Sequence, residues 1–151
     1  MTTEPSAASA IEGALSRATA RVDDAVRALS ERRRVDLTGL PPSAAALVLA
    51  RYAAATSRRV LVLTADTDAA RRAVSDLELF GGLDDSDGES HGDVLVYPAH
   101  EVSPFLEVAP DRRAAMDRLS ALFHLAQRLP WRFLVAPLSA LARRVRPAPP
   151  S

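Results

Sequence analysis

Residues 60–66 read Val60-Leu61-Val62-Leu63-Thr64-Ala65-Asp66, and this stretch decides the fold class. Four apolar residues without polar alternation are typical of a strand in a parallel sheet that is covered on both faces. Asp66 or Thr67 follows as a helix N-cap. Apolar residues at helical spacing come next, namely Ala70, Val74, Leu77 and Phe80. We therefore predict a buried strand joined directly to a helix over about 68–80, with these four residues on its inner side.

The same alternation of short apolar runs and helical patterns extends in both directions. Strands are predicted at 35–37, at Val94-Leu95-Val96-Tyr97 and at Phe133-Leu134-Val135-Ala136. Helices are predicted over about 44–56 with Ser43 as N-cap, over 111–127 and over 138–145. The inner face expected for the helix at 111–127 consists of Met116, Leu119, Leu122, Phe123 and Ala126. This order predicts an α/β fold, a mostly parallel sheet flanked by helices.

An additional helix is predicted before the first strand. Its apolar face consists of Ile11, Leu15, Ala18, Val22, Val26 and Leu29, and it is expected to end near Arg32-Arg33-Arg34. The predicted organisation is an N-terminal helical extension over 1–34 and an α/β domain over 35–147. Residues 148–151 form a Pro-rich end or a truncation.

Composition excludes several classes of site. The chain has 151 residues and no cysteine, which excludes disulfides and zinc–sulfur sites. Nineteen basic residues, all of them Arg, balance nineteen acidic ones, so no net charge draws the chain to nucleic acid. There is no apolar run of membrane-spanning length and no basic leader, so we expect a cytoplasmic protein without membrane contact.

The turn before the predicted helix at 44–56 is where an open parallel sheet would hold a phosphate. A phosphate-binding loop reads G-x-x-x-x-G-K-[ST], whereas residues 36–43 read Asp36-Leu37-Thr38-Gly39-Leu40-Pro41-Pro42-Ser43. Asp36 and Pro41 replace the two glycines and Pro42 replaces the lysine, so only the Ser43 hydroxyl remains. Two prolines also remove two N–H donors. We predict a degenerate phosphate loop that holds no nucleotide.

No other catalytic or metal site is predicted. The acidic loop 84–89 fails the ligand spacing of a calcium-binding loop, and His91, His100 and His124 have no metal-ligand spacing. The most distinctive stretch is 97–107, where two prolines keep the backbone extended. Phe105 and Leu106 lie in it where a solvated loop would carry polar residues. They close over the sheet edge or form a docking surface with His100 and Glu101.

In order, these segments resemble the N-terminal region of the bacterial transcription-repair coupling factor. The resemblance covers about residues 35–147. It rests on Leu37-Thr38-Gly39-Leu40, Leu63-Thr64-Ala65-Asp66, Tyr97-Pro98-Ala99-His100-Glu101-Val102-Ser103-Pro104-Phe105, Arg118-Leu119-Ser120-Ala121-Leu122 and Val135-Ala136-Pro137-Leu138-Ser139-Ala140-Leu141. In the third segment the family typically has Trp where this chain has His100, and Val108-Ala109-Pro110 replaces its Ser-Pro-His.

The resemblance implies a degenerate helicase-like (RecA-like) domain similar to the excinuclease protein UvrB but without a working ATP site. The family is an ATP-driven DNA translocase that releases stalled RNA polymerase and recruits the excinuclease protein UvrA for nucleotide excision repair. Its motor, which uses ATP and Mg, and most of its contacts with polymerase, DNA and UvrA lie downstream. We therefore expect this chain to be a non-catalytic scaffold fragment of an enzyme. The alternative is a small stand-alone α/β nucleotide-binding or interaction module.

Overall fold

The computed structural model describes residues 7–82, 94–99 and 112–142. In chain order the elements are α1 (Ala7–Glu31), α2 (Pro42–Thr56), β1 (Val60–Thr64), α3 (Thr67–Gly81), β2 (Val94–Val96), α4 (Arg112–Ala126), β3 (Phe133–Pro137) and α5 (Leu138–Leu141). Three of the four predicted strands and all of the predicted helices are present. The α/β class is confirmed.

Within the described residues the sheet has three parallel strands in the order β1-β3-β2. Phe133, the first residue of the central strand β3, is in register with Val60 of β1 and with Val94 of β2. All three strands therefore start at one edge of the sheet, which we call the amino edge, and end at the opposite, carboxyl edge.

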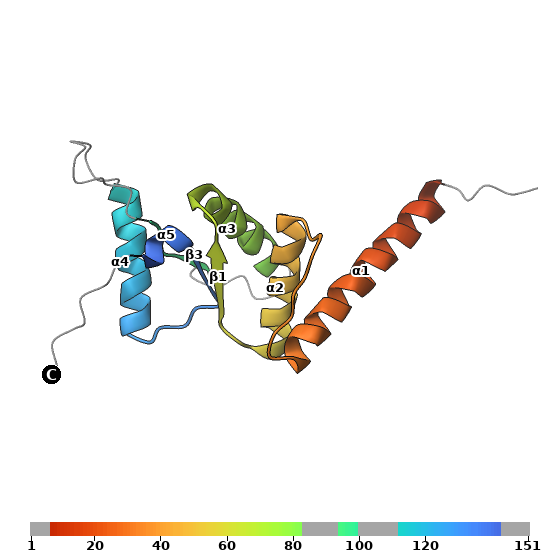
Figure 1. Cartoon of the computed structure of the whole chain (residues 1–151), viewed down its shortest axis with the longest axis horizontal. Coiled ribbons are helices and arrows are strands. Elements are labelled where there is room, and N and C mark those ends of the chain that lie inside the picture. The colour runs from red at the N-terminus through yellow and green to blue at the C-terminus, as the bar shows by residue number, and fades with distance from the viewer. Residues whose placement is uncertain (1–6, 83–93, 100–111, 143–151) are drawn as a thin grey trace, which may run out of the picture.

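Helices lie on both sides of the sheet, and α1 forms a further layer outside α2 (Figure 1). Alternate residues of β3 point to opposite faces. Phe133 and Val135 face α2 and α3 and pack against Ala46, Ala50, Ala53, Ala70 and Leu77. Leu134 and Ala136 pack on the other face with Ala121 of α4 and Ala140 of α5. Small alanines let the helices approach the sheet closely.

Helix α3 forms as the sequence predicts. Asp66 is its N-cap, and the side-chain oxygen accepts a hydrogen bond of 2.7 Å from the backbone N–H of Ala69. Ala70 and Leu77 are buried, while Val74 and Phe80 are half-buried and pack against the same cluster. The predicted inner side of this helix is confirmed.

The segment before α2 differs from the prediction. Residues 35–37 form no strand, and the N-cap of α2 is Pro41 rather than Ser43. Pro41 has an extended backbone, and Pro42 takes the first helical position, where a missing N–H costs no hydrogen bond. Three residues are too short a run to specify a strand without a neighbour to pair with.

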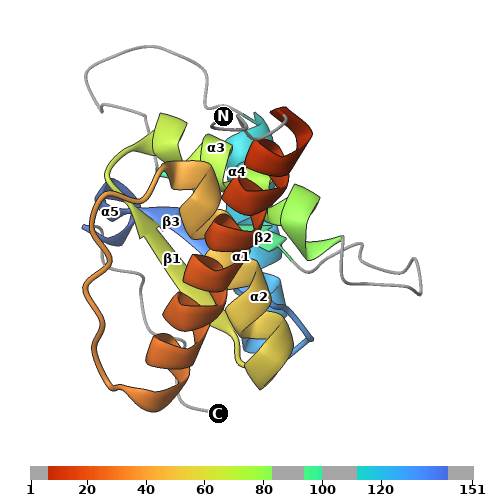
Figure 2. The ribbon, with the colours of Figure 1, turned by 90° about the vertical axis from the view of Figure 1, so that its right-hand side faces the viewer.

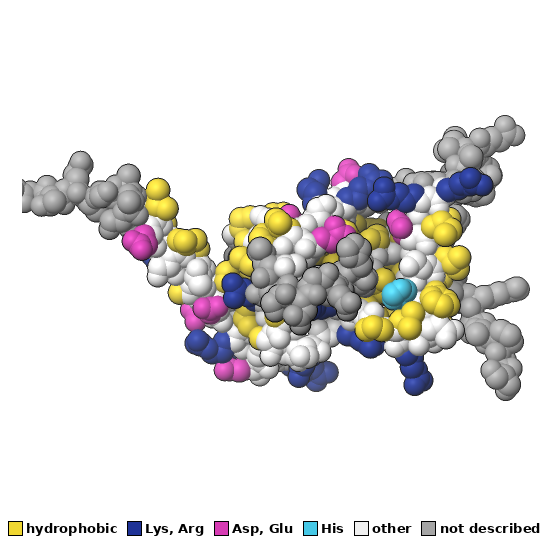
Figure 3. All heavy atoms as spheres, turned by 180° about the vertical axis from the view of Figure 1, so that it is seen from behind, with side chains coloured by type: hydrophobic (Ala, Val, Ile, Leu, Met, Phe, Trp, Pro, Cys, Tyr) yellow, Lys and Arg dark blue, Asp and Glu magenta, His cyan; other side chains and the backbone are white. Residues whose placement is uncertain are grey.

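Two apolar faces also differ from the prediction. On β1, Leu61 is 53% exposed and Leu63 is 47% exposed, so among the described residues one face of this edge strand is uncovered. On α4, Met116, Leu119 and Phe123 point outward, and the buried residue is Ala121, with Leu122 packed beside it. Figure 3 shows the hydrophobic side chains that gather on the outer surface of α4.

Helix α1 is continuous, as predicted, but only part of it is packed. Val22, Val26 and Leu29 near its C-terminal end are half-buried, whereas Ile11 and Leu15 are exposed. Figure 2 shows α1 in front of α2 and α3, which separate it from the sheet. No helix in the described part of the chain is long and apolar enough to cross a membrane.

Candidate functional site

The degenerate loop at 36–43 lies on the carboxyl side of the sheet. Helix α2 ends at Thr56, and β1 starts at Val60, so the C-terminus of α2 is at the amino edge and its N-terminus points the other way (Figure 1). The position therefore agrees with that of a ligand-binding turn. The strand that should precede such a turn is absent, so the strand–loop–helix geometry of a phosphate site is not formed.

The loop itself offers few groups to an anion. Pro41 and Pro42 carry no N–H, and the N–H of Ala45 is already bonded to the Pro41 carbonyl at 3.0 Å. The first turn of α2 thus leaves only the N–H groups of Ser43 and Ala44 without an acceptor inside the helix. Asp36 adds a carboxylate, which lies 3.5 Å from Arg34 with both side chains largely exposed.

Gly39 is the one loop residue whose backbone demands glycine. Its φ of +68° is left-handed, and no atom would contact an added Cβ. Glycine is needed there for the bend rather than for close approach of a ligand. The segment that enters α2 thus contains all of the predicted site residues, namely Asp36, Gly39, Pro41, Pro42 and Ser43. Its two prolines restrict the backbone.

The predicted docking residues His100, Glu101, Phe105 and Leu106 lie outside the described residues, as does the acidic loop 84–89. The start of the distinctive stretch is described, and it contacts α4. The Arg118 guanidinium lies over the Tyr97 ring and donates a hydrogen bond of 3.2 Å to the Pro98 carbonyl.

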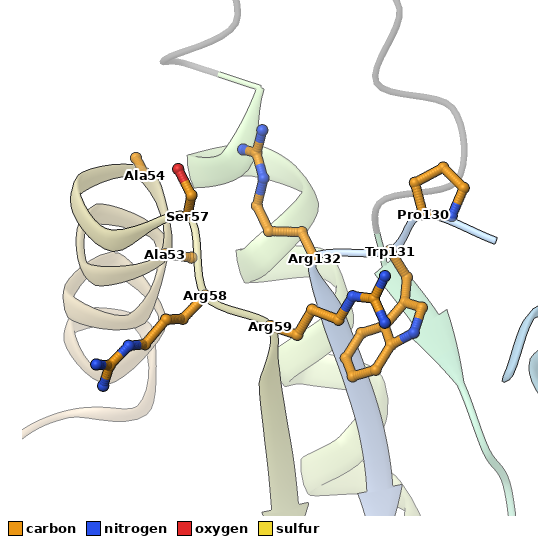
Figure 4. Close-up of a pocket in the computed structure, with 8 residues that line it drawn as sticks. All are labelled: Ala53, Ala54, Ser57, Arg58, Arg59, Pro130, Trp131 and Arg132. Atoms are coloured by element: carbon orange, nitrogen blue, oxygen red, sulfur yellow. The ribbon is translucent and has the colours of Figure 1, made fainter. Parts of the chain in front are cut away.

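A second feature lies at the amino edge, and sequence reasoning missed it. A shallow pocket of about 290 Å³ is lined by Ala53, Ala54, Ser57, Arg58, Arg59, Pro130, Trp131 and Arg132 (Figure 4). The guanidinium carbon of Arg59 is 5.2 Å from the centroid of the Trp131 ring. The N–H of Val60 donates to the Arg132 carbonyl at 2.9 Å, which holds the two sides of the pocket together.

The local fold explains why these residues meet. Ser57, with φ of 52°, ends α2 in a left-handed conformation, and the chain then turns directly into β1. Arg58 and Arg59 therefore lie just before β1, as Trp131 and Arg132 lie just before β3. Because β1 and β3 are parallel neighbours in register, both pairs lie at the same edge. The sequence signal is an arginine directly before β1 (Arg59) and directly before β3 (Arg132), and it becomes informative once the register of these two strands is known.

His124 lies on α4, where it is half-buried. Its Nδ1 atom is buried and has no hydrogen-bond partner among the described residues. No group of three or more His, Asp or Glu side chains within the described ranges could hold a metal ion.

Most of the chain is similar to a known protein. The chain is 39% identical over 128 residues to the transcription-repair-coupling factor of Myxococcus xanthus. This chain is similar to part of a transcription-repair coupling factor. The match covers 85% of the chain but 10% of the relative, so the chain corresponds to a small part of that protein. No protein-family model matches, and no solved structure matches significantly.

The match agrees with the resemblance seen in the sequence motifs. A three-stranded α/β sheet does not by itself establish a degenerate phosphate-loop (RecA-like) domain. Residues 35–37 form no strand, so the strand–loop–helix turn that would define such a domain is not formed. The described architecture is an α/β sheet flanked by helices.

Proposed function

We propose that this chain is a non-catalytic scaffold segment of a transcription-repair coupling factor. The observation that carries the proposal is the 39% identity to such a factor over 85% of the chain. The geometry at 36–43 agrees with a scaffold role, because two prolines and a carboxylate occupy the turn where a phosphate would otherwise be held.

We infer from the resemblance the activity of the longer protein to which this segment would belong. It would use ATP and Mg in other domains to translocate on DNA, release stalled RNA polymerase in the cytoplasm and recruit the excinuclease protein UvrA. In this proposal the present segment supplies architecture and a docking surface. The ATP is bound and hydrolysed elsewhere.

A chimaeric protein tests the proposal. The matching segment of the Myxococcus xanthus coupling factor is replaced by this chain, and two activities are measured, ATP hydrolysis and preferential repair of the transcribed strand. We expect the chimaera to keep both, and Ser43→Ala in it to change neither by more than about twofold, which is under ~0.5 kcal/mol in the barrier.

Two results would contradict the proposal. Loss of ATP hydrolysis in the Ser43→Ala chimaera would make the segment catalytic. Normal ATP hydrolysis without strand-specific repair would mean that the chain cannot serve as this factor's scaffold.

A further inference from the structure

Helix α1 packs on the outer side of α2 with only part of its apolar stripe. Val22, Val26 and Leu29 are half-buried, whereas Ile11 and Leu15 of the same stripe are exposed. Figure 1 shows the N-terminal half of α1 extending away from α2 and from the rest of the fold. The contact that holds α1 therefore involves its C-terminal half.

The polar side-chain contacts of α1 join residues of this helix to one another. The hydroxyl groups of Thr19 and Ser30 donate to backbone carbonyls four residues earlier in α1, at 3.0 and 2.8 Å. Arg27 and Asp24 pair at 3.4 Å, also within α1, and both side chains are largely exposed. None of these contacts joins α1 to α2. In the part of the chain that the structure describes, apolar side chains therefore hold α1 in place.

The residue of α2 that α1 covers is Val48. It is 1% exposed, yet it lies two positions from both Ala46 and Ala50, which pack on the side of the sheet. Residues two positions apart point to nearly opposite sides of a helix, because each residue turns the helix by about 100°. Val48 thus faces the outer side of α2, where α1 lies (Figure 2). We conclude that α1 is what buries Val48.

The connection between the two helices is exposed. Residues 32–41 join α1 to α2, and all of them except the half-buried Val35 are exposed. A connection of this length can span up to about 33–36 Å, whereas the axes of two packed helices are about 8–10 Å apart. Helix α1 can therefore leave α2 while the connection stays attached to the start of α2.

Burial differs sharply between this contact and the core. Leu77, Phe133 and Val135 are almost completely buried, whereas no described side chain of α1 is more than half-buried. Layers that bury little apolar surface open before the core does. We propose that α1 is a detachable cover, which leaves α2 as one unit while the α/β body stays folded. Its release exposes the outer face of α2 at Val48.

This inference goes beyond the scaffold role, which assigns no movement to the segment. It also predicts that α1 loses its backbone protection on release, because most helical stability in proteins comes from packing.

Native-state hydrogen exchange of the 151-residue chain, measured by mass spectrometry, tests the proposal. Amides of residues 22–31 should exchange at least about hundredfold faster than those of β3, because they open without global unfolding. Equal protection of the two segments would overturn the proposal, since α1 would then open only with the whole chain. So would exchange of residues 22–31 at the rate of an unfolded chain, since α1 would then cover nothing.

A matched pair of double variants tests which part of the stripe holds α1. Val26→Asn with Leu29→Asn should bring residues 22–31 to within about tenfold of the exchange rate of an unfolded chain, while β3 stays at least about hundredfold slower. Ile11→Asn with Leu15→Asn makes a similar change where the stripe is exposed and should alter neither segment by more than about twofold. Equal effects of the two double variants contradict the proposal.

Val48 separates a cover from a part of the core. Val48→Asn should release α1 in the same way, with β3 still protected, because the outer face of α2 tolerates water once α1 has left. The control is Val135→Asn in the core, which should weaken the protection of β3 and α3 as well. If Val48→Asn removes the protection of β3 as far as Val135→Asn does, or leaves α1 fully protected, the proposal is wrong.

Discussion

The Arg118 guanidinium carbon lies 4.2 Å from the centroid of the Tyr97 ring, and this contact joins α4 to the residue that follows β2. Tyr97 is itself held to the sheet, since its N–H donates to the Val135 carbonyl at 2.8 Å. The other contacts of α4 with the sheet come from small or half-buried side chains such as Ala121 and Leu122. Two segments on which the family resemblance rests are thus in direct contact.

Arg118→Ala should destabilise the chain by about 1–3 kcal/mol, because it removes both the cation–π contact and the charged hydrogen bond to the Pro98 carbonyl. Urea unfolding followed by circular dichroism measures the change. The matched control is Arg72→Ala at an exposed position of α3, for which we expect less than about 0.5 kcal/mol. Equal effects of the two substitutions would show that the Tyr97 contact contributes nothing.

Leu77 and Leu79 provide a matched pair on one helix. Leu77 is 1% exposed in the core between α3 and the sheet, whereas Leu79 is 62% exposed. Leu77→Ala should cost about 2–5 kcal/mol through lost burial and the cavity left behind, and Leu79→Ala should cost under about 0.5 kcal/mol. The same unfolding measurement distinguishes them, and a larger loss at Leu79 would mean that α3 is rotated from the position described.

Removal of the α3 cap should also be measurable. Asp66→Ala leaves the Ala69 N–H without its acceptor and should cost about 0.5–2 kcal/mol, whereas Asp66→Ser keeps an oxygen there and should cost less. Thermal unfolding of both variants compares them. A Ser variant no more stable than the Ala variant would argue against capping as the role of Asp66.

His124 is the position where a substitution should do no harm. Its buried Nδ1 has no hydrogen-bond partner, so His124→Leu removes an unsatisfied polar atom and should be neutral or stabilising by up to about 1 kcal/mol. A loss of more than ~1 kcal/mol in urea unfolding would mean that this nitrogen has a partner in solution.

Prediction from the sequence was most accurate where several local signals agreed. At β1 and α3 an apolar run, a capping Asp66 and helical spacing predicted a strand followed directly by a helix, and the structure has both, although one face of β1 is uncovered among the described residues. The strand at 35–37 was wrong because a run of three residues carries no information about a pairing partner, and only tertiary neighbours decide whether it joins a sheet.

Packing against the sheet was harder to predict. The prediction for α4 assumed that large apolar residues face inward. In the structure Ala121 is buried against the sheet, and Met116 and Phe123 are exposed. The pocket at the amino edge could not be predicted either, since Arg59 and Trp131 meet only through the parallel register of β1 and β3. For the loop at 36–43, the loss of N–H donors could be predicted from the two prolines alone.

Titration of the 151-residue chain with a fluorescent ATP analogue and Mg measures whether this segment holds a nucleotide. We predict no saturable binding up to about 1 mM, which corresponds to a binding free energy weaker than about −4 kcal/mol. Saturable binding in the micromolar range that is lost on Ser43→Ala would contradict it.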